Sequence, residues 1–238
     1  MVKIRSKSGW ETVSQHLNIY DSLFDQMGDM KHTPEIINLR ETIKEWRFYD
    51  HFRTDKDAPA RQIQLATRTP VLYHDGRDLT AALQTIIEIG NNQALNAAIE
   101  DAFPGSKITI TKQGDGYLSV EMNQHGLLRP LACSEFSDGT LRYLLLVAAL
   151  MTPRPPKLMI LNEPETSLHP DLLPSLARLI IQASKNTQIW VISHANCLVD
   201  ALNNHPQCNR MTLEKQVGQT KIIGQDFLRT PQWKWPDS

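Results

Sequence analysis

The sequence predicts an α/β fold with parallel core strands, flanking helices and one β-hairpin. Two short apolar runs, residues 158–161 and 188–192, have the length of buried strands. Between them, residues 171–184 carry leucine and isoleucine at helical spacing, which is typical of a helix that joins two parallel strands. Residues 107–111 and 117–122 instead alternate polar and apolar side chains about a glycine-rich turn, as the strands of a hairpin do.

The composition narrows the class of protein. The chain has 238 residues, of which 41% are apolar, so it can bury one sizeable core. Its formal net charge of −1 gives no global electrostatic case for a nucleic-acid or anionic-membrane partner. The three cysteines form no Cys-x-x-Cys pair, and no apolar run reaches the roughly 20 residues of a membrane helix. We therefore expect a cytoplasmic protein without a membrane segment.

The first 70 residues are expected to be helical or irregular. Apolar residues between positions 13 and 27 suggest a helix, or a loop and a helix, with turns around Gly9 and Gly28. Residues 34–46 predict a firmer helix, because a proline opens it and its isoleucine, leucine and tryptophan side chains share one face.

An aromatic cluster follows at residues 46–52. We expect it to pack in a core or between lobes, and a platform for a nucleotide base is the alternative. Arg53, Arg61 and Arg68 flank the cluster. For these arginines we expect solvated surface positions, with phosphate contacts as the alternative.

Two helices are predicted before the hairpin. Asp78 can cap a helix over residues 79–89, which Gly90 ends. An asparagine at position 91 or 92 opens the second helix, over residues 93–103. This helix ends at the Pro-Gly pair that follows.

A Ser-Asp-Gly-Thr turn at residues 137–140 opens a strongly apolar helix that runs toward Pro153. A helix amino terminus with a serine and a glycine can bind an anion, because its backbone N–H groups are free and the helix dipole is positive there. The alternative is an ordinary helix cap, since serine and aspartate are common at that position.

Polar residues follow both predicted core strands. Asn162 and Glu163 come directly after the first strand, and Ser193 and His194 after the second. Ligands of open α/β folds bind at the carboxyl edge of the sheet, where these residues are expected to meet. Asn162 and Glu163 suit a magnesium shell and the orientation of an attacking water. A structural role is the alternative for His194.

Taken in order, these segments resemble four motifs of ABC-type ATPases. Residues 137–140 are similar to the signature motif, 158–163 to Walker B with the catalytic glutamate, 166–169 to the D-loop, and 193–194 to the switch histidine. The residues of these motifs resemble those of SMC- and RecF-like heads, and of bacterial predicted AAA-family ATPases, more closely than those of transporters. The resemblance is firm from about residue 130 to 200.

The resemblance implies a P-loop NTPase-type (ABC ATPase-like) fold that uses ATP and Mg²⁺. Glu163 would polarise the lytic water, His194 would contact the γ-phosphate, and Asn162 would stand at the metal. A second ATPase head would be the partner, and DNA a further one. The residues that the resemblance implies for nucleotide contact are Ser137, Asp138, Gly139, Thr140, His169 and Ser193.

Two departures from the family pattern shape the expectation. Asn162 stands where the Walker B aspartate is usual, so we expect weaker magnesium binding. No Gly-x-x-x-x-Gly-Lys-[Ser/Thr] occurs in the 238 residues. We therefore expect a carboxy-terminal lobe whose amino-terminal P-loop lobe is absent, with an exposed apolar patch where that lobe would pack.

The expected organisation has three parts. Residues 1–70 come from the lobe junction, 71–206 form the lobe with the signature, Walker B and switch histidine, and 207–238 form a closing hairpin around Gly218 with a tail. The leading hypothesis is an ATP-hydrolysing head that works by ATP-driven dimerisation. The alternative is a non-catalytic half-site, or regulatory binding module, that completes a partner ATPase.

Overall fold

The computed structural model describes residues 2–6, 9–14, 16, 18–26, 33–114, 116–216 and 218–223. At its centre lies a parallel sheet in the order β3 (Arg47–Tyr49), β8 (Leu158–Asn162) and β9 (Gln188–Ile192). The predicted α/β class with parallel core strands is therefore confirmed, and both predicted core strands are present. The sequence analysis missed β3, which lies inside the aromatic cluster.

A second, antiparallel sheet contains the predicted hairpin. Strands β5 (Ser106–Gln113) and β6 (Tyr117–Gln124) pair along their whole length, with Ile110 opposite Val120. Two short strands, β4 (Gln64–Leu65) and β7 (Leu131–Ala132), also pair with β6.

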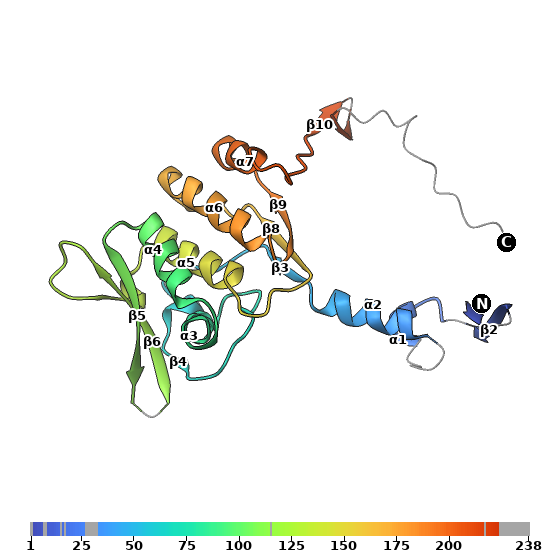
Figure 1. Ribbon diagram of the computed structural model, residues 1–238, viewed down its shortest axis with the longest axis horizontal. Coiled ribbons are helices and arrows are strands. Elements are labelled where there is room, and N and C mark those ends of the chain that lie inside the picture. Colours follow the sequence, from blue (N-terminus) through green and yellow to red (C-terminus); the bar gives the residue numbers. More distant parts are fainter. Residues whose placement is uncertain are drawn as a thin grey trace.

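Helices fill the space between the two sheets (Figure 1). They are α3 (Leu79–Ile89), α4 (Asn92–Ala102), α5 (Asp138–Leu150) and α6 (Leu173–Ala183), and α7 (Asn196–Asn203) follows β9. Helix α5 is buried from Leu141 to Leu150, as its uniformly apolar sequence requires. One core joins the sheets, because the hairpin residues Ile108 and Val120 and the strand residues Met159 and Leu161 belong to the same cluster.

The two predicted helix caps have different outcomes. Asn91 caps α4, accepting a hydrogen bond from the N–H of Ala94 at 2.9 Å. Asp78 precedes α3 but makes no capping bond; its Oδ1 accepts from the N–H of Tyr73 at 3.0 Å. The side-chain cap predicted for Asp78 is therefore wrong, because the preceding loop takes its carboxylate.

One face of the parallel sheet packs on the core, and the other is open only at its flanking strands, because Leu158 and Ile160 of β8 are 7% and 9% exposed. Met159 and Leu161 of β8 are fully buried and face the core with Tyr49 of β3. On the other face, Phe48, Ile160 and Trp190 are aligned across the three strands. Phe48 is 55% exposed and Trp190 is 56% exposed, although parallel sheets are normally covered on both faces. The predicted exposed apolar patch is therefore present only on the flanking strands, whereas residues 158–161 are buried, and its cause stays a prediction.

The amino-terminal segment differs from its prediction. Strands β1 (Val2–Ser6) and β2 (Gly9–Ser14) pair antiparallel, where helical or irregular structure was expected. Gly9 has a φ of 129°, which only glycine adopts readily, and this backbone starts the second strand. Helices α1 (Leu23–Gln26) and α2 (Pro34–Lys44) follow, and α2 confirms the helix predicted from Pro34.

The closing hairpin is confirmed as β10 (Leu213–Gln216) and β11 (Gln219–Ile222). The tail of the expected 207–238 segment, residues 224–238, lies outside the described residues, as do Leu17, Met27 and Gly28. Among the helices described, none combines the length and hydropathy needed to cross a bilayer. Single 3-10 turns stand at Pro59–Arg61, Cys133–Glu135 and Pro170–Leu172.

Candidate functional site

The carboxyl ends of β8 and β9 bring together the two residues predicted for catalysis. The backbone N–H of Glu163 donates to the carbonyl of Ile192 at 2.8 Å, which extends the pairing of the strands by one residue. Beyond that bond, Nε2 of His194 lies 3.6 Å from Oε1 of Glu163. Both side chains are substantially exposed, so a ligand at this edge can reach them. A carboxylate and an imidazole at this separation can act on one water and one phosphate.

Glu163 has an unusual backbone conformation. Its φ is 44°, in the left-handed region that L residues rarely adopt. Three hydrogen bonds hold it: the bond to Ile192, and bonds of 3.1 Å to its carbonyl oxygen from the N–H of Thr166 and from Nη2 of Arg142. Arg142 lies on α5 and is 4% exposed, and burial lowers its guanidinium pKa. Strain of this kind persists where surrounding contacts impose it, which is common at functional sites.

Asp50 is a site residue that the sequence analysis missed. It follows β3 directly, and its Oδ1 accepts a hydrogen bond from Nδ2 of Asn162. A carboxylate therefore lies beside the position where the Walker B aspartate is usual. Within the described ranges no group of three or more His, Cys, Asp or Glu side chains could hold a metal alone. Mg²⁺ is often bound by one or two carboxylates together with phosphates, and the oxygens of Asp50, Asn162 and Glu163 fit that arrangement.

Glu165 is the second missed residue, and it binds the turn that carries His194. Its Oε1 accepts from the Oγ of Ser193 at 2.8 Å, from the N–H of His194 at 2.8 Å and from the N–H of Ala195 at 3.2 Å. The hydroxyl of Ser193, predicted for nucleotide contact, is thus directed to Glu165. A glutamate after a proline carries no local pattern that would have identified this role.

The signature-like residues form a second group, in an open pocket of about 570 Å³. Ser137 caps α5 by accepting from the N–H of Thr140 at 3.1 Å, so the cap interpretation is correct. Ser137 and Thr140 also line the pocket, so a helix cap and an anion site at the start of α5 are compatible. The residues that line this pocket include Ser137, Gly139, Thr140, Ser167, Leu168, His169 and Asp171.

A close backbone approach explains the glycine of this group. A Cβ atom added at Gly139 would lie 2.8 Å from the carbonyl oxygen of Ser167. Ser167 itself has a φ of 63°, so the loop after Glu163 is bent tightly against the start of α5. His169 lies farther along this loop, where its Nδ1 accepts from the N–H of Asp171 at 3.3 Å. The loop therefore connects the sheet edge with the pocket.

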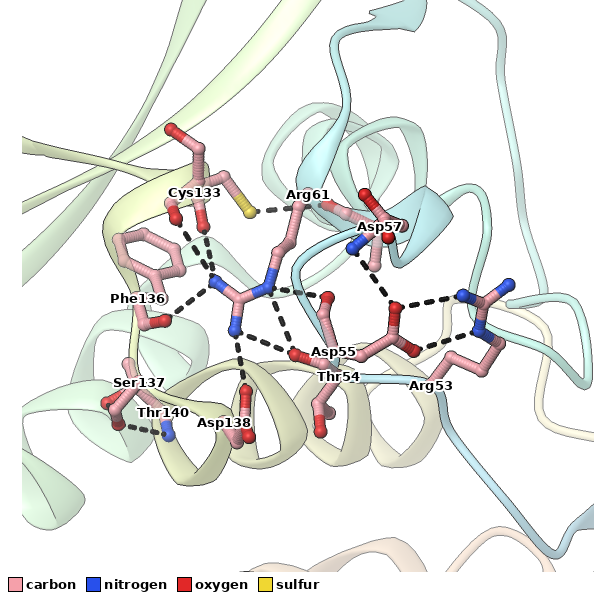
Figure 2. Close-up of polar contacts among 12 residues, drawn as sticks. Arg53, Thr54, Asp55, Asp57, Arg61, Cys133, Phe136, Ser137, Asp138 and Thr140 are labelled. Atoms are coloured by element: carbon pink, nitrogen blue, oxygen red, sulfur yellow. Dashed lines mark hydrogen bonds and ion pairs between the residues drawn. The ribbon is translucent and has the colours of Figure 1, made fainter.

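Arg61 is buried, and its predicted solvated position is wrong (Figure 2). Its guanidinium donates to the carbonyl oxygens of Thr54, Cys133 and Phe136, and pairs with a carboxylate oxygen of Asp138 at 2.8 Å. Asp138, predicted for nucleotide contact, is thereby held at Arg61 and is not among the pocket residues. Arg53 and Arg68 have the expected exposed positions, where they pair with Asp55 and Glu88.

The aromatic cluster serves mainly as core. The hydroxyl of Tyr49 donates to the carbonyl of Leu72 at 2.9 Å, and Tyr49 and Phe52 are each 3% exposed with their rings in contact. The packing interpretation is therefore confirmed for these two residues, and Phe48 belongs to the open face of the sheet.

Comparisons with known proteins agree with this geometry. Residues 4–200 match the family model described as "AAA domain, putative AbiEii toxin, Type IV TA system". The chain is similar to a crystal structure of an Smc head bound to the winged-helix domain of ScpA, with a TM-score of 0.54 and 14% identity over 80% of this chain and 60% of that one. No curated protein sequence matches the chain.

Two further solved structures are Smc heads from Pyrococcus. The head with coiled coil and joint from Pyrococcus yayanosii has a TM-score of 0.48 and 15% identity, over 59% of this chain and 27% of that one. The head from Pyrococcus furiosus, bound to the C-terminal domain of ScpA, also has a TM-score of 0.48 and 15% identity, over 63% of this chain and 37% of that one. The chain thus spans only part of the length of these structures.

Proposed function

The chain belongs to the AAA domain family, and on that premise we propose that it is an ATP-binding and ATP-hydrolysing head of the ABC, SMC and RecF-like class. The head works by ATP-driven association with a second head. The observation that carries the proposal is the separation of 3.6 Å between His194 and Glu163 at the carboxyl edge of a parallel sheet.

The roles of the residues at this edge follow from their chemistry. Glu163 orients the attacking water and accepts its proton, and His194 contacts the γ-phosphate. Asp50 and Asn162 present oxygens to the metal, so the carboxylate of Asp50 takes part of the role of a Walker B aspartate. ATP would supply the transferred phosphoryl group, and Mg²⁺ would stabilise the charge on it.

The pocket at the start of α5 is proposed to face the second head. Gly139 lies in the first turn of α5, where backbone N–H groups lack helical partners and attract anions, whereas the N–H of Thr140 already donates to Ser137. The pocket is open, as expected of a surface that is completed by a partner. The partner's γ-phosphate would be its ligand, and the loop with Leu168 and His169 would run along the seam.

A non-catalytic half-site is the second candidate. It is favoured by the open apolar face of the parallel sheet, with Phe48 and Trp190 more than half exposed. The absence of a Gly-x-x-x-x-Gly-Lys-[Ser/Thr] motif from these 238 residues also favours it. In this case another polypeptide segment would cradle the β- and γ-phosphates, and the present residues would supply the signature and the water-orienting group.

Equilibrium binding and turnover of Mg-ATP separate the two candidates. An ATPase head binds Mg-ATP at micromolar concentration and hydrolyses it, and Glu163→Gln lowers turnover by about a hundredfold or more without weakening binding. The control is Glu88→Gln, at an exposed glutamate of α3 that accepts from Gln84, and it leaves both quantities unchanged. A half-site binds at millimolar concentration or not at all, which would reject the catalytic proposal for these residues.

A further inference from the structure

We infer that Glu165 is a positioning residue for His194. The catalytic consequence of this inference rests on the proposed function, whereas its structural part does not. The side chain of His194 is 84% exposed, and among the described residues Glu163 is its one ionic neighbour. Its position is therefore set by the backbone turn that carries it, and Glu165 holds that turn.

Three donors of the turn converge on one oxygen atom. Oε1 of Glu165 accepts from the hydroxyl of Ser193 and from the N–H groups of His194 and Ala195, at 2.8 to 3.2 Å. Hydrogen bonds to an ionised acceptor are about twice as strong as bonds between neutral groups. One carboxylate oxygen thus fixes three consecutive residues, and it ties the end of β9 to the loop that follows β8.

The other oxygen of Glu165 points to a role for charge. Oε2 is buried and has no hydrogen-bond partner among the described residues, and the same is true of Nε of Arg142. Burial lowers the pKa of the Arg142 guanidinium, and the negative charges of Glu165, Glu163 and Asp50 act against that effect. Arg142 also donates to the carbonyl of Glu163. The two side chains thus act on different catalytic residues: Arg142 holds the backbone of Glu163, and Glu165 holds the backbone of His194.

The arrangement explains why an amide would not replace Glu165. A glutamine could keep an oxygen toward the turn, but an amide oxygen is a weaker acceptor than a carboxylate oxygen, and its NH₂ group would be buried at the place of Oε2. An aspartate is one methylene too short. Glu165→Gln is thus expected to loosen the turn although it preserves the size of the side chain.

Amide hydrogen exchange on the full chain without ligand tests the structural part. Glu165→Ala should make the amides of residues 194 and 195 exchange about ten to a hundredfold faster, with Glu165→Gln intermediate. The matched control is Glu100→Ala, because Glu100 also accepts a backbone N–H, that of Gly105, at 2.9 Å. This control should speed the amide exchange of residue 105 and leave the exchange of residues 194 and 195 unchanged. Unchanged exchange at 194 and 195 in both Glu165 variants would overturn the inference, and Glu165→Gln serves if the alanine variant does not fold.

A double-mutant cycle on Mg-ATP turnover tests the catalytic part. If Glu165 acts through His194, Glu165→Gln lowers kcat at least tenfold in the wild-type background and little in the His194→Ala background. Equal losses in both backgrounds would show a general structural role and reject positioning of His194. Absence of turnover in the unmodified chain would count against the proposed function alone, because the exchange experiment needs no ATP.

Discussion

The side-chain amide of Asn162 donates to the carboxylate of Asp50 at the carboxyl ends of two neighbouring strands. In the proposed ATPase head, a carboxylate and an amide from different strands would take the place of a single Walker B carboxylate. One negative charge therefore remains at the place where Mg²⁺ is proposed to bind, and it comes from a strand that the sequence did not reveal.

Exchanging the amide for an acid tests this relationship. Asn162→Asp would put two carboxylates side by side, and their repulsion should lower the free energy of unfolding by about 1 kcal/mol without metal. Added Mg²⁺ should reverse the loss, because a cation between the carboxylates replaces the lost donor. Thermal unfolding with and without Mg²⁺ measures both effects.

A reversed pair provides the control for that variant. The double change Asp50→Asn with Asn162→Asp restores one donor and one acceptor, so its stability should return toward that of the unmodified chain without metal. If Mg²⁺ does not change the thermal unfolding of the Asn162→Asp variant, the proposed metal position is contradicted.

Gly139 is required by the loop that packs against it. Gly139→Ala should destabilise the chain by about 1 to 3 kcal/mol, because the new methyl group meets the backbone oxygen of Ser167 at 2.8 Å and backbone cannot move aside cheaply. Denaturant unfolding measures this change. An unchanged or raised midpoint would contradict it, since alanine is otherwise a better helix former than glycine.

Arg61 should be indispensable for the start of α5. Arg61→Ala removes the guanidinium donor from the buried carbonyl oxygen of Phe136 and one of the two donors to that of Cys133, and should cost about 3 kcal/mol of unfolding free energy. Arg61→Lys should recover only part of it, because an ammonium cannot span the same acceptors. The control is Arg53→Ala, at an exposed ion pair with Asp55, which should change stability little. Equal effects at the two arginines would contradict the buried role.

The sequence predicts the regular core well because its signals are local. Strands β8 and β9 and helices α5 and α6 are marked by apolar residues at the spacing of their own secondary structure. Strand β3 has only three residues, and its aromatic side chains are equally compatible with packing or binding. The pairing of β3 with β8 is a long-range choice that local periodicity does not encode.

The missed site residues share the same physical cause. Arg61 is satisfied by carbonyl oxygens of residues 133–136, and Glu165 by a turn on the next strand, so neither partner is visible near the residue in sequence. Glu163 and His194 were predictable because each directly follows a recognisable strand. Asp50 would have been predictable by the same rule had β3 been recognised.

Cys133 should be chemically inert in the folded chain. Burial raises the pKa of its thiol to about 12, and its Sγ donates to the carbonyl of Ala60, whereas Cys197 and Cys208 are exposed. Between the ordinary thiol pKa and about 12, only unfolded chains form the thiolate of Cys133, so rising pH favours unfolding there. An alkylating reagent at neutral pH should label two thiols, and the third only in denaturant. Labelling of a Cys197→Ser, Cys208→Ser variant under native conditions would contradict this.

The open face of the parallel sheet should bind an apolar dye. Phe48 and Trp190 lie in register on either side of the buried Ile160, each more than half exposed, and Ile192 on β9 is also 50% exposed. The native chain should therefore enhance the fluorescence of anilinonaphthalene sulfonate, and Trp190→Lys should remove most of that enhancement. A matched change at an exposed residue of another segment, Leu128→Lys, should leave most of it in place. Equal dye binding by the native chain and by Trp190→Lys would mean that the apolar surface lies elsewhere, and the half-site candidate would lose its main structural support.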